Sequence, residues 1–387
     1  MERKKILLVA MADSVHVARW LDSVSELPID VVLISSSPNR WVHPGILRHK
    51  QGTGGLIVSI PFLTKFLAIP FWVLDKTCIF SGRLRGLVIA HYVRRMNPSC
   101  IHIMESQNGG YAYLRARSFS LRVARLPVLL TLFGSDLYWF SRFPTHSLRL
   151  RELMSVVDLV ATEGRRDRIL ARNMGFRGEF LTSMPASGGI LESEFIPVAA
   201  LEPLARKTIA VKGYSNSLGV GERALESLKL VLPAQLMSWQ IVVFSAQGKS
   251  IRAAMDLRKM GYDVRIFRKH QLKHSEVLQI LRRSRVFIGL SRSDGLPATF
   301  LEAMAQGAFP IQSTTSMADD WIKHAETGFL VDPDSRESIR TAIEHALKDD
   351  DLLQRAVTTN LAKVQAEASN ERLSKILKAE FRRFVGV

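Results

Sequence analysis

Residues Ser291–Gly307 read SRSDGLPATFLEAMAQG, and this stretch decides the predicted fold. It follows Val286–Leu290 (VFIGL), a continuous apolar run that is typical of a buried parallel strand. Pro297 suits the first turn of a helix, because its missing N–H is not needed there. Gly307 suits the end of that helix, before a further strand. The stretch is therefore predicted to form a strand, a loop and a helix that opens at the carboxyl edge of a sheet.

The start of this helix is a candidate anion site. The amides around Pro297, from Leu296 through Ala298 to Thr299, present the positive end of the helix dipole, which suits a diphosphate. Glu302 lies one turn further on, where a carboxylate can accept hydrogen bonds from two ribose hydroxyls. The alternative for Glu302 is a surface residue of an ordinary helix.

Strands and helices alternate through both halves of the chain. Predicted strands at Lys5–Ala10 and Asp30–Ile34 enclose a helix, and the alternation restarts at Thr208–Val211 after the turn-rich segment Pro185–Arg206. Because 387 residues are too many for one core, two α/β domains are expected. We place them at 1–195 and 196–370, followed by a basic helix at 371–387 that packs back towards the first domain. Ligands of such sheets bind beyond the carboxyl ends of the strands.

The segment Asp294-GLPATFL-Glu302-AMAQG resembles the signature of the family 4 (group 1) retaining glycosyltransferases. That signature has an acid, seven residues, a Glu, Ala-Met-Ala and a Gly, and Asp294 stands here for the more usual Glu. The continuation to Phe329-LVDP is also similar to the family. The resemblance implies a GT-B fold, in which two Rossmann-like domains face each other across a cleft. It further implies retaining transfer from a nucleotide-sugar donor, with no metal and no cofactor. UDP is our first expectation for the nucleotide, and GDP is the second.

The same resemblance extends to the phosphate contacts. Lys212 is expected to contact the diphosphate, with Gly213 allowing close approach of the backbone. The spacing of a second cation is not reproduced, so Arg268, Lys269 and Arg292 remain open alternatives for it. Asp294 is expected to face the donor sugar.

In the first domain, Thr131–Asp136 (TLFGSD) resembles the family segment that faces the donor sugar. Phe133 stands where many members have a histidine, which leaves Asp136 as the polar candidate there. The alternative is that Asp136 caps a helix beginning at Leu137.

Two further residues follow the first domain's strands. His16, in the loop after the first strand, is a candidate contact for the acceptor or the diphosphate, although a lone histidine is often structural. Glu105 has a similar position after the strand Ser99–Met104. The predicted catalytic residues are Asp294, Lys212, Asp136 and His16.

The net charge of +17 calls for an anionic partner. Between Arg40 and Arg125 there are thirteen Lys and Arg against two acids. Aromatic residues are interleaved with these charges, a mixture that favours an anionic membrane surface. We therefore expect a glycan or lipid-linked acceptor, as in bacterial polysaccharide, lipopolysaccharide or glycolipid synthesis. The aromatic residues are Phe62, Phe66, Phe71, Trp72 and Phe80.

Several classes of protein are disfavoured. The apolar region Leu56–Phe80 is broken by prolines and charges, which argues against a membrane-spanning helix. No secretory signal is recognisable, and Cys78 and Cys100 fit reduced thiols. We therefore expect a cytoplasmic protein at the inner face of the membrane. Nucleic-acid binding, suggested by the charge, lacks the usual motifs and is not expected. A nucleotide-binding but catalytically degenerate GT-B protein remains an alternative.

Overall fold

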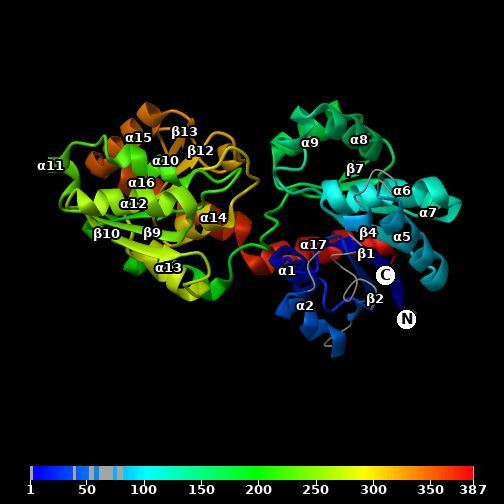
Figure 1. Cartoon of the computed structure of the whole chain (residues 1–387). Coiled ribbons are helices and arrows are strands. Elements are labelled where there is room, and N and C mark those ends of the chain that lie inside the picture. The colour runs from blue at the N-terminus through cyan, green and yellow to red at the C-terminus, as the bar shows by residue number, and fades with distance from the viewer. Residues whose placement is uncertain (1–2, 38–40, 52–55, 61–72, 76–81, 387) are drawn as a thin grey trace. The chain divides into compact units, whose positions relative to one another are not determined.

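The chain forms two compact α/β units (Figure 1). Unit 1 comprises Met1–Gly188 and Arg372–Val387, and unit 2 comprises Gly189–Glu371. The boundaries predicted from the sequence were 195 and 370. The computed structural model describes residues 3–37, 41–51, 56–60, 73–75 and 82–386. The aromatic residues Phe62, Phe66, Phe71, Trp72 and Phe80, and also Cys78, lie outside the described residues.

Among the described residues, unit 1 contains a seven-stranded sheet in the order β3-β2-β1-β4-β5-β6-β7. Every neighbouring pair is parallel. Side chains alternate between the faces, so Ile6 and Leu8 enter one apolar cluster while Leu7 and Val9 enter another. Both faces are therefore covered, as the continuous apolar run of β1 predicts. The strands are β1 Lys4–Ala10, β2 Ile29–Ser35, β3 Ile57–Ser59, β4 Cys100–Met104, β5 Val128–Thr131, β6 Leu159–Ala161 and β7 Glu179–Phe180.

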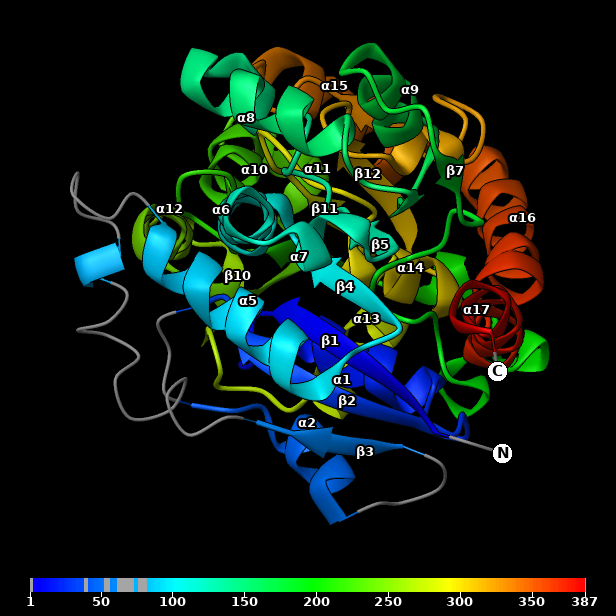
Figure 2. The same ribbon diagram turned by 90° about the vertical axis from the view of Figure 1, so that its right-hand side faces the viewer.

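Helices pack on both faces of this sheet. α1, α2 and α17 contribute to the cluster with Ile6, and α5 to α9 contribute to the cluster with Leu7. Figure 2 shows α5 and α6 together on their face of the sheet. α5 ends because Asn97 takes a left-handed conformation (φ 50°) before Pro98. The helices are α1 Val15–Ser23, α2 Pro44–Arg48, α5 Arg83–Met96, α6 Tyr111–Phe119, α7 Leu121–Arg125, α8 Pro144–Met154, α9 Arg165–Asn173 and α17 Asn370–Val385.

The described residues of unit 2 contain a six-stranded parallel sheet in the order β10-β9-β8-β11-β12-β13. α10, α12 and α15 pack on the face that carries Ile209 and Val211, while α13 and α14 pack on the face of Ala210 and Phe287. The strands are β8 Thr208–Lys212, β9 Gln240–Ala246, β10 Asp263–Arg268, β11 Val286–Gly289, β12 Phe309–Ser313 and β13 Phe329–Val331. The helices are α10 Gly221–Leu228, α11 Pro233–Leu236, α12 Gly248–Lys259, α13 His274–Arg283, α14 Ala298–Ala305, α15 Arg336–Lys348 and α16 Asp350–Ala368.

Short 3-10 or π turns connect these elements at His49–Gln51, Ser106–Gly110, Phe140–Arg142, Glu192–Glu194, Val198–Ala200, Pro203–Ala205 and Ala318–Asp320. In the part of the chain that the structure describes, no helix is long and apolar enough to cross a bilayer.

Candidate functional site

The loop between β11 and α14 is fastened to the neighbouring strand β12. The amide of Ser291 donates to Ser313 Oγ at 3.2 Å, and the amide of Asp294 donates to the Thr315 carbonyl at 3.4 Å. Thr315 Oγ1 donates in turn to the Ser291 carbonyl. Asp294 is half-buried, and its Oδ1 accepts a hydrogen bond from the Gly295 amide at 2.9 Å. The loop therefore presents Asp294 from a braced backbone at the carboxyl edge of the sheet.

Helix α14 begins one residue after Pro297. Pro297 itself is extended (ψ 124°), and its carbonyl accepts the first helical hydrogen bond from Phe300 at 3.0 Å. The amides of Ala298 and Thr299 belong to the first turn, which has no intrahelical acceptors for them. Both residues are half-buried, whereas Leu296 is buried. The helix start predicted near Pro297 is thus present, while its role as an anion site stays a prediction.

Glu302 is a buried residue, 7% exposed, so the alternative of an ordinary surface position is wrong. Its Oε1 lies 3.0 Å from His274 Nε2. The other ring nitrogen of His274, Nδ1, lies 3.4 Å from Glu194 Oε1. His274 therefore holds one oxygen of the Glu302 carboxylate in place. Sequence reasoning missed this histidine, which is the first residue of α13.

Lys212 ends β8, and its ammonium group lies over the ring of Tyr214, with 4.7 Å between Nζ and the ring centroid. The ammonium group of Lys269 lies 5.9 Å from the same centroid. Tyr214, which sequence reasoning did not select, therefore brings two cations together. Of the three alternatives for the second cation, Lys269 is the one that shares this position with Lys212. The close approach that Gly213 allows is to β9, since a Cβ on Gly213 would lie 2.8 Å from Ala246 Cα.

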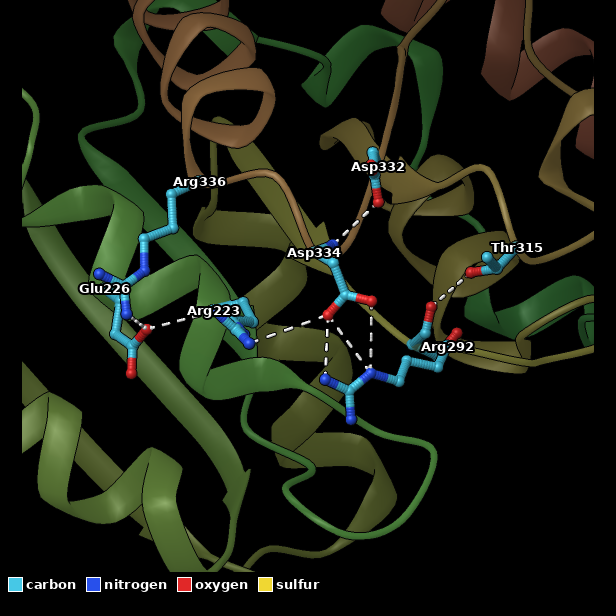
Figure 3. Close-up of polar contacts among 8 residues, drawn as sticks. Arg223, Glu226, Arg292, Thr315, Asp332, Asp334 and Arg336 are labelled. Carbon is cyan, nitrogen blue, oxygen red and sulfur yellow. Dashed lines mark hydrogen bonds and ion pairs between the residues drawn. The ribbon is translucent and has the colours of Figure 1, made fainter.

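Arg292, another of the alternatives, is engaged in an ionic network (Figure 3). Its Nη2 lies 3.0 Å from Asp334 Oδ1, and this contact holds the pKa of Asp334 below its usual range. Arg223 also approaches Asp334, at 3.9 Å. Arg292 thus braces the loop that carries Asp294. Arg268 ends β10 as an exposed residue, and its amide donates to Gln271 Oε1 at 2.8 Å.

In unit 1, His16 lies in the first turn of α1, where Ser14 Oγ accepts a hydrogen bond from the His16 amide at 3.2 Å. Its Nδ1 lies 3.0 Å from the carbonyl of Ala186. The ring centroids of His16 and Phe133 are 5.3 Å apart. The structure therefore brings together two of the residues singled out in this unit, at the carboxyl ends of β1 and β5.

Asp136 does not cap a helix, because residues 134–139 form turns and no α-helix begins at Leu137. Its buried carboxylate instead accepts hydrogen bonds from the amides of Ser106, at 3.0 Å, and Phe133, at 3.2 Å. Burial raises the pKa of Asp136 well above its ordinary value, and the charge of Glu105 raises it further. Asp136 thus ties together the loops that follow β4 and β5.

Glu105 plays a comparable part. It is buried, has a φ of 95°, and accepts hydrogen bonds from the amides of Asn108 at 3.0 Å and Gly109 at 2.5 Å. Burial raises the pKa of its carboxyl group, while the two amide bonds act in the opposite direction. The carboxylate closes the turn Ser106–Gly110, so a direct contact with an acceptor would require this turn to open.

Solved structures with the same architecture were found over the full length of the chain. HepE (Alr3699) from Anabaena, solved in complex with UDP and glucose, is 12% identical, with 98% of this chain and 100% of that chain covered and a TM-score of 0.67. Sucrose-phosphate synthase from Thermosynechococcus elongatus is 15% identical, with coverages of 99% and 100% and a TM-score of 0.69. An E. coli structure described as trehalose-6-phosphate bound with UDP-2-fluoro glucose is 14% identical, with 99% of each chain covered and a TM-score of 0.66.

These similarities define the class of the protein by its fold: two Rossmann-like units of the GT-B type. A search of curated proteins finds no match. Residues 222–363 match the family model described as glycosyl transferases group 1. The matched segment contains Asp294–Gly307, and the match confirms the resemblance drawn from that stretch.

Proposed function

We propose that the protein transfers a sugar from a nucleotide-sugar donor, with UDP as the first expectation and GDP as the second. The observation that carries the proposal is the buried Glu302, held by His274 one turn after the free amides of α14. A carboxylate fixed in this way can accept from a ribose while the helix start holds a diphosphate. The UDP-bound HepE structure, which has the same fold, supports this choice of nucleotide.

The proposed chemistry needs positive charge at the leaving diphosphate. Lys212 and Lys269 gather on Tyr214 at the ends of β8 and β10, and the first-turn amides of α14 follow the neighbouring strand β11. Preorganised groups of this kind stabilise charge that develops in the transition state. The resemblance to the family implies that the acceptor attacks with retention of configuration and that no metal is needed. In this proposal Asp294 faces the donor sugar and His16 the acceptor, while Asp136 positions the loop of Phe133.

The donor is tested by thermal unfolding in the presence of UDP, GDP, ADP or CMP. At 100 times its dissociation constant, the correct nucleotide stabilises unit 2 by about 2.7 kcal/mol. Glu302→Ala should abolish this shift, whereas Glu326→Ala, on an exposed loop of the same unit, should retain it. If no nucleotide stabilises the protein, the proposal is wrong.

Retention and metal independence need a turnover assay with the identified donor. NMR of the released or transferred sugar should show the same anomeric configuration as the donor. Incubation with EDTA should leave the rate unchanged. An inverted product, or a rate that is lost with EDTA and restored by a divalent cation, would contradict this part of the proposal.

We further propose that the acceptor is a glycan or a lipid-linked molecule at an anionic membrane surface. Helices α5 to α7 pack against one another and leave Leu87, Phe119 and Leu121 exposed by 52%, 44% and 76%. From Arg83 to Arg125 the sequence has eight arginines and one acid, the buried Glu105. Exposed apolar groups among arginines suit insertion between anionic headgroups. This supports a position at the cytoplasmic face of a bacterial membrane, in polysaccharide, lipopolysaccharide or glycolipid synthesis.

Vesicle co-sedimentation tests the membrane contact. Binding to vesicles of phosphatidylcholine with phosphatidylglycerol should fall with added salt, and binding to phosphatidylcholine alone should be weak. Reversing two charges on α7, Arg122→Glu with Arg125→Glu, should weaken binding at least tenfold. The control is Arg252→Glu with Arg355→Glu, which changes the net charge equally on exposed positions of unit 2. Equal losses in both double variants would mean that α7 is not the contact.

Phe133 favours one alternative, a protein that binds the nucleotide without turnover, because it stands where many family members have a histidine. Both functions predict UDP stabilisation. Only the active enzyme should release sugar from the donor, in the presence of an acceptor or slowly to water. Binding without any release would support the degenerate protein.

A further inference from the structure

An apolar cavity lies in unit 1 at the carboxyl edge of its sheet. It is partly open to the surface, and its lining is almost entirely apolar. The side chains that line it come from α1, from the ends of β4, β5 and β6, from the segment after β7 and from α17. They include Trp20, Met104, Leu129, Leu181 and Leu377.

A neutral histidine backs the cavity wall at Thr131. His102 lies beneath it, fully buried, with Nε2 2.9 Å from Oγ1 of Thr131, which lines the cavity. The His102 ring also packs edge-on against Trp20, with 4.6 Å between the centroids. Burial lowers the pKa of His102 to about 3, so the imidazole stays neutral.

Polar groups contact the segment after β7, which lines one side of the cavity. Glu163 Oε1 accepts a hydrogen bond from the Ala186 amide at 3.0 Å, and His16 Nδ1 contacts the Ala186 carbonyl at the same distance. His16 and Phe133 both line the cavity. The apolar interior therefore adjoins His16, a predicted contact for the acceptor or the diphosphate, and Phe133, whose segment was predicted to face the donor sugar.

We propose that this cavity binds the hydrocarbon chain of the acceptor. The inference rests on the proposed function, since it assigns the class of the molecule that receives the sugar. A glycan would need hydrogen-bond partners along its length, and walls of Leu, Met and Trp supply few of them. The exposed arginines of the same unit complement the phosphate that commonly joins such a chain to its sugar. The occupant is therefore an apolar chain whose hydroxyl-bearing end lies at His16.

Alkyl glucosides of increasing chain length provide the direct test. Butyl, hexyl and octyl β-glucoside, each below its critical micelle concentration, are titrated against the full chain and followed by tryptophan fluorescence and calorimetry. Affinity should rise about fourfold for each methylene that becomes fully buried. Affinity that does not depend on chain length would overturn the proposal.

A variant that fills the cavity tests its position. Ala161 lines the cavity from the end of β6 and is half-buried. Ala161→Leu should weaken octyl glucoside binding at least tenfold and should leave butyl glucoside nearly unchanged. Ala362→Leu, at an exposed position of α16, adds the same groups elsewhere and should have no effect. If Ala161→Leu does not fold, Leu377→Ala removes part of the wall and should reduce the dependence on chain length. Unchanged octyl binding in a folded cavity variant would refute the site.

Nucleotide binding separates this proposal from the proposed function. Chain-length-dependent binding that Ala161→Leu abolishes supports the cavity even if no nucleotide stabilises the protein. UDP stabilisation without chain-length-dependent binding retains the glycosyltransferase and overturns the hydrocarbon site.

Discussion

The carboxyl edges of the two sheets use ionisable side chains in opposite ways. In unit 2, Lys212 is half-buried, Lys269 is exposed and the His274 side chain is 45% exposed, so ionisable groups are accessible at this edge. In unit 1, Asp136 and His102 are buried and engaged with neighbouring groups of the protein. The surface that this edge offers is correspondingly apolar. The difference fits a polar donor in one unit and an apolar acceptor chain in the other, and it can be tested from both sides.

The largest effect is expected for Lys212→Ala. Removing a preorganised charge from the leaving diphosphate should lower kcat about 10²-fold to 10³-fold, or about 3–4 kcal/mol. Lys259→Ala is the matched control. Lys259 is exposed at the C-terminus of α12, near the amino edge of the sheet, whereas Lys212 lies at the carboxyl edge. Equal kinetics of the Lys212 variant and the wild type would show that Lys212 supplies no charge to the reaction.

His102→Gln should change the acid stability of unit 1. The folded pKa of His102, about 3, lies below the value of about 6.5 in the unfolded chain. Its contribution to stability is therefore present above pH 6.5 and is lost as the pH falls towards 3. The loss amounts to about 1.4 kcal/mol per pH unit. Urea unfolding at pH 6 and pH 4 gives the change in unfolding free energy with pH, and this change per pH unit should be smaller by about this amount in the variant. An unchanged slope would mean that His102 is not buried as a neutral group.

His274→Ala should weaken UDP binding by about fivefold to tenfold. One hydrogen bond to the Glu302 carboxylate is lost, and such bonds contribute about 1–1.5 kcal/mol. Calorimetry with UDP measures the change, and His270→Ala, at an exposed position after β10, serves as the control. If Glu302→Ala weakens UDP binding and His274→Ala does not, Glu302 binds the nucleotide without the help of His274.

Asp136→Asn should give the smallest effect, on stability at neutral pH. The pKa of Asp136 is raised in the folded state, so the unfolded chain releases its proton first. The stability of the wild type therefore falls as the pH rises from about 4 through the folded pKa, by at most about 1.4 kcal/mol per unit. The asparagine oxygen can accept the same two amide bonds without titrating. The difference in unfolding free energy between variant and wild type should thus grow with pH. A constant difference would contradict a raised pKa of the buried Asp136 carboxyl group.

The sequence alone determined the alternation of strands and helices and the donor signature. These features are local, because apolar runs, prolines and cap residues act within a few positions. The helix predicted from Pro297 and Gly307 is present as α14, which begins at Ala298. The short strand β3 was missed because three residues carry too little periodicity to be recognised.

The partners of the site residues were decided only by the tertiary structure. Glu302 and His274 are 28 positions apart, and Lys212 and Lys269 meet through Tyr214 across two strands. Asp136 was predicted as a polar contact or a helix cap, yet its carboxylate is taken up by the amides of Ser106 and Phe133. Such contacts depend on which strands become neighbours, and local patterns carry no record of that order. The apolar cavity has the same origin, since its walls come from α1, several strand ends and α17, which only the folded chain brings together.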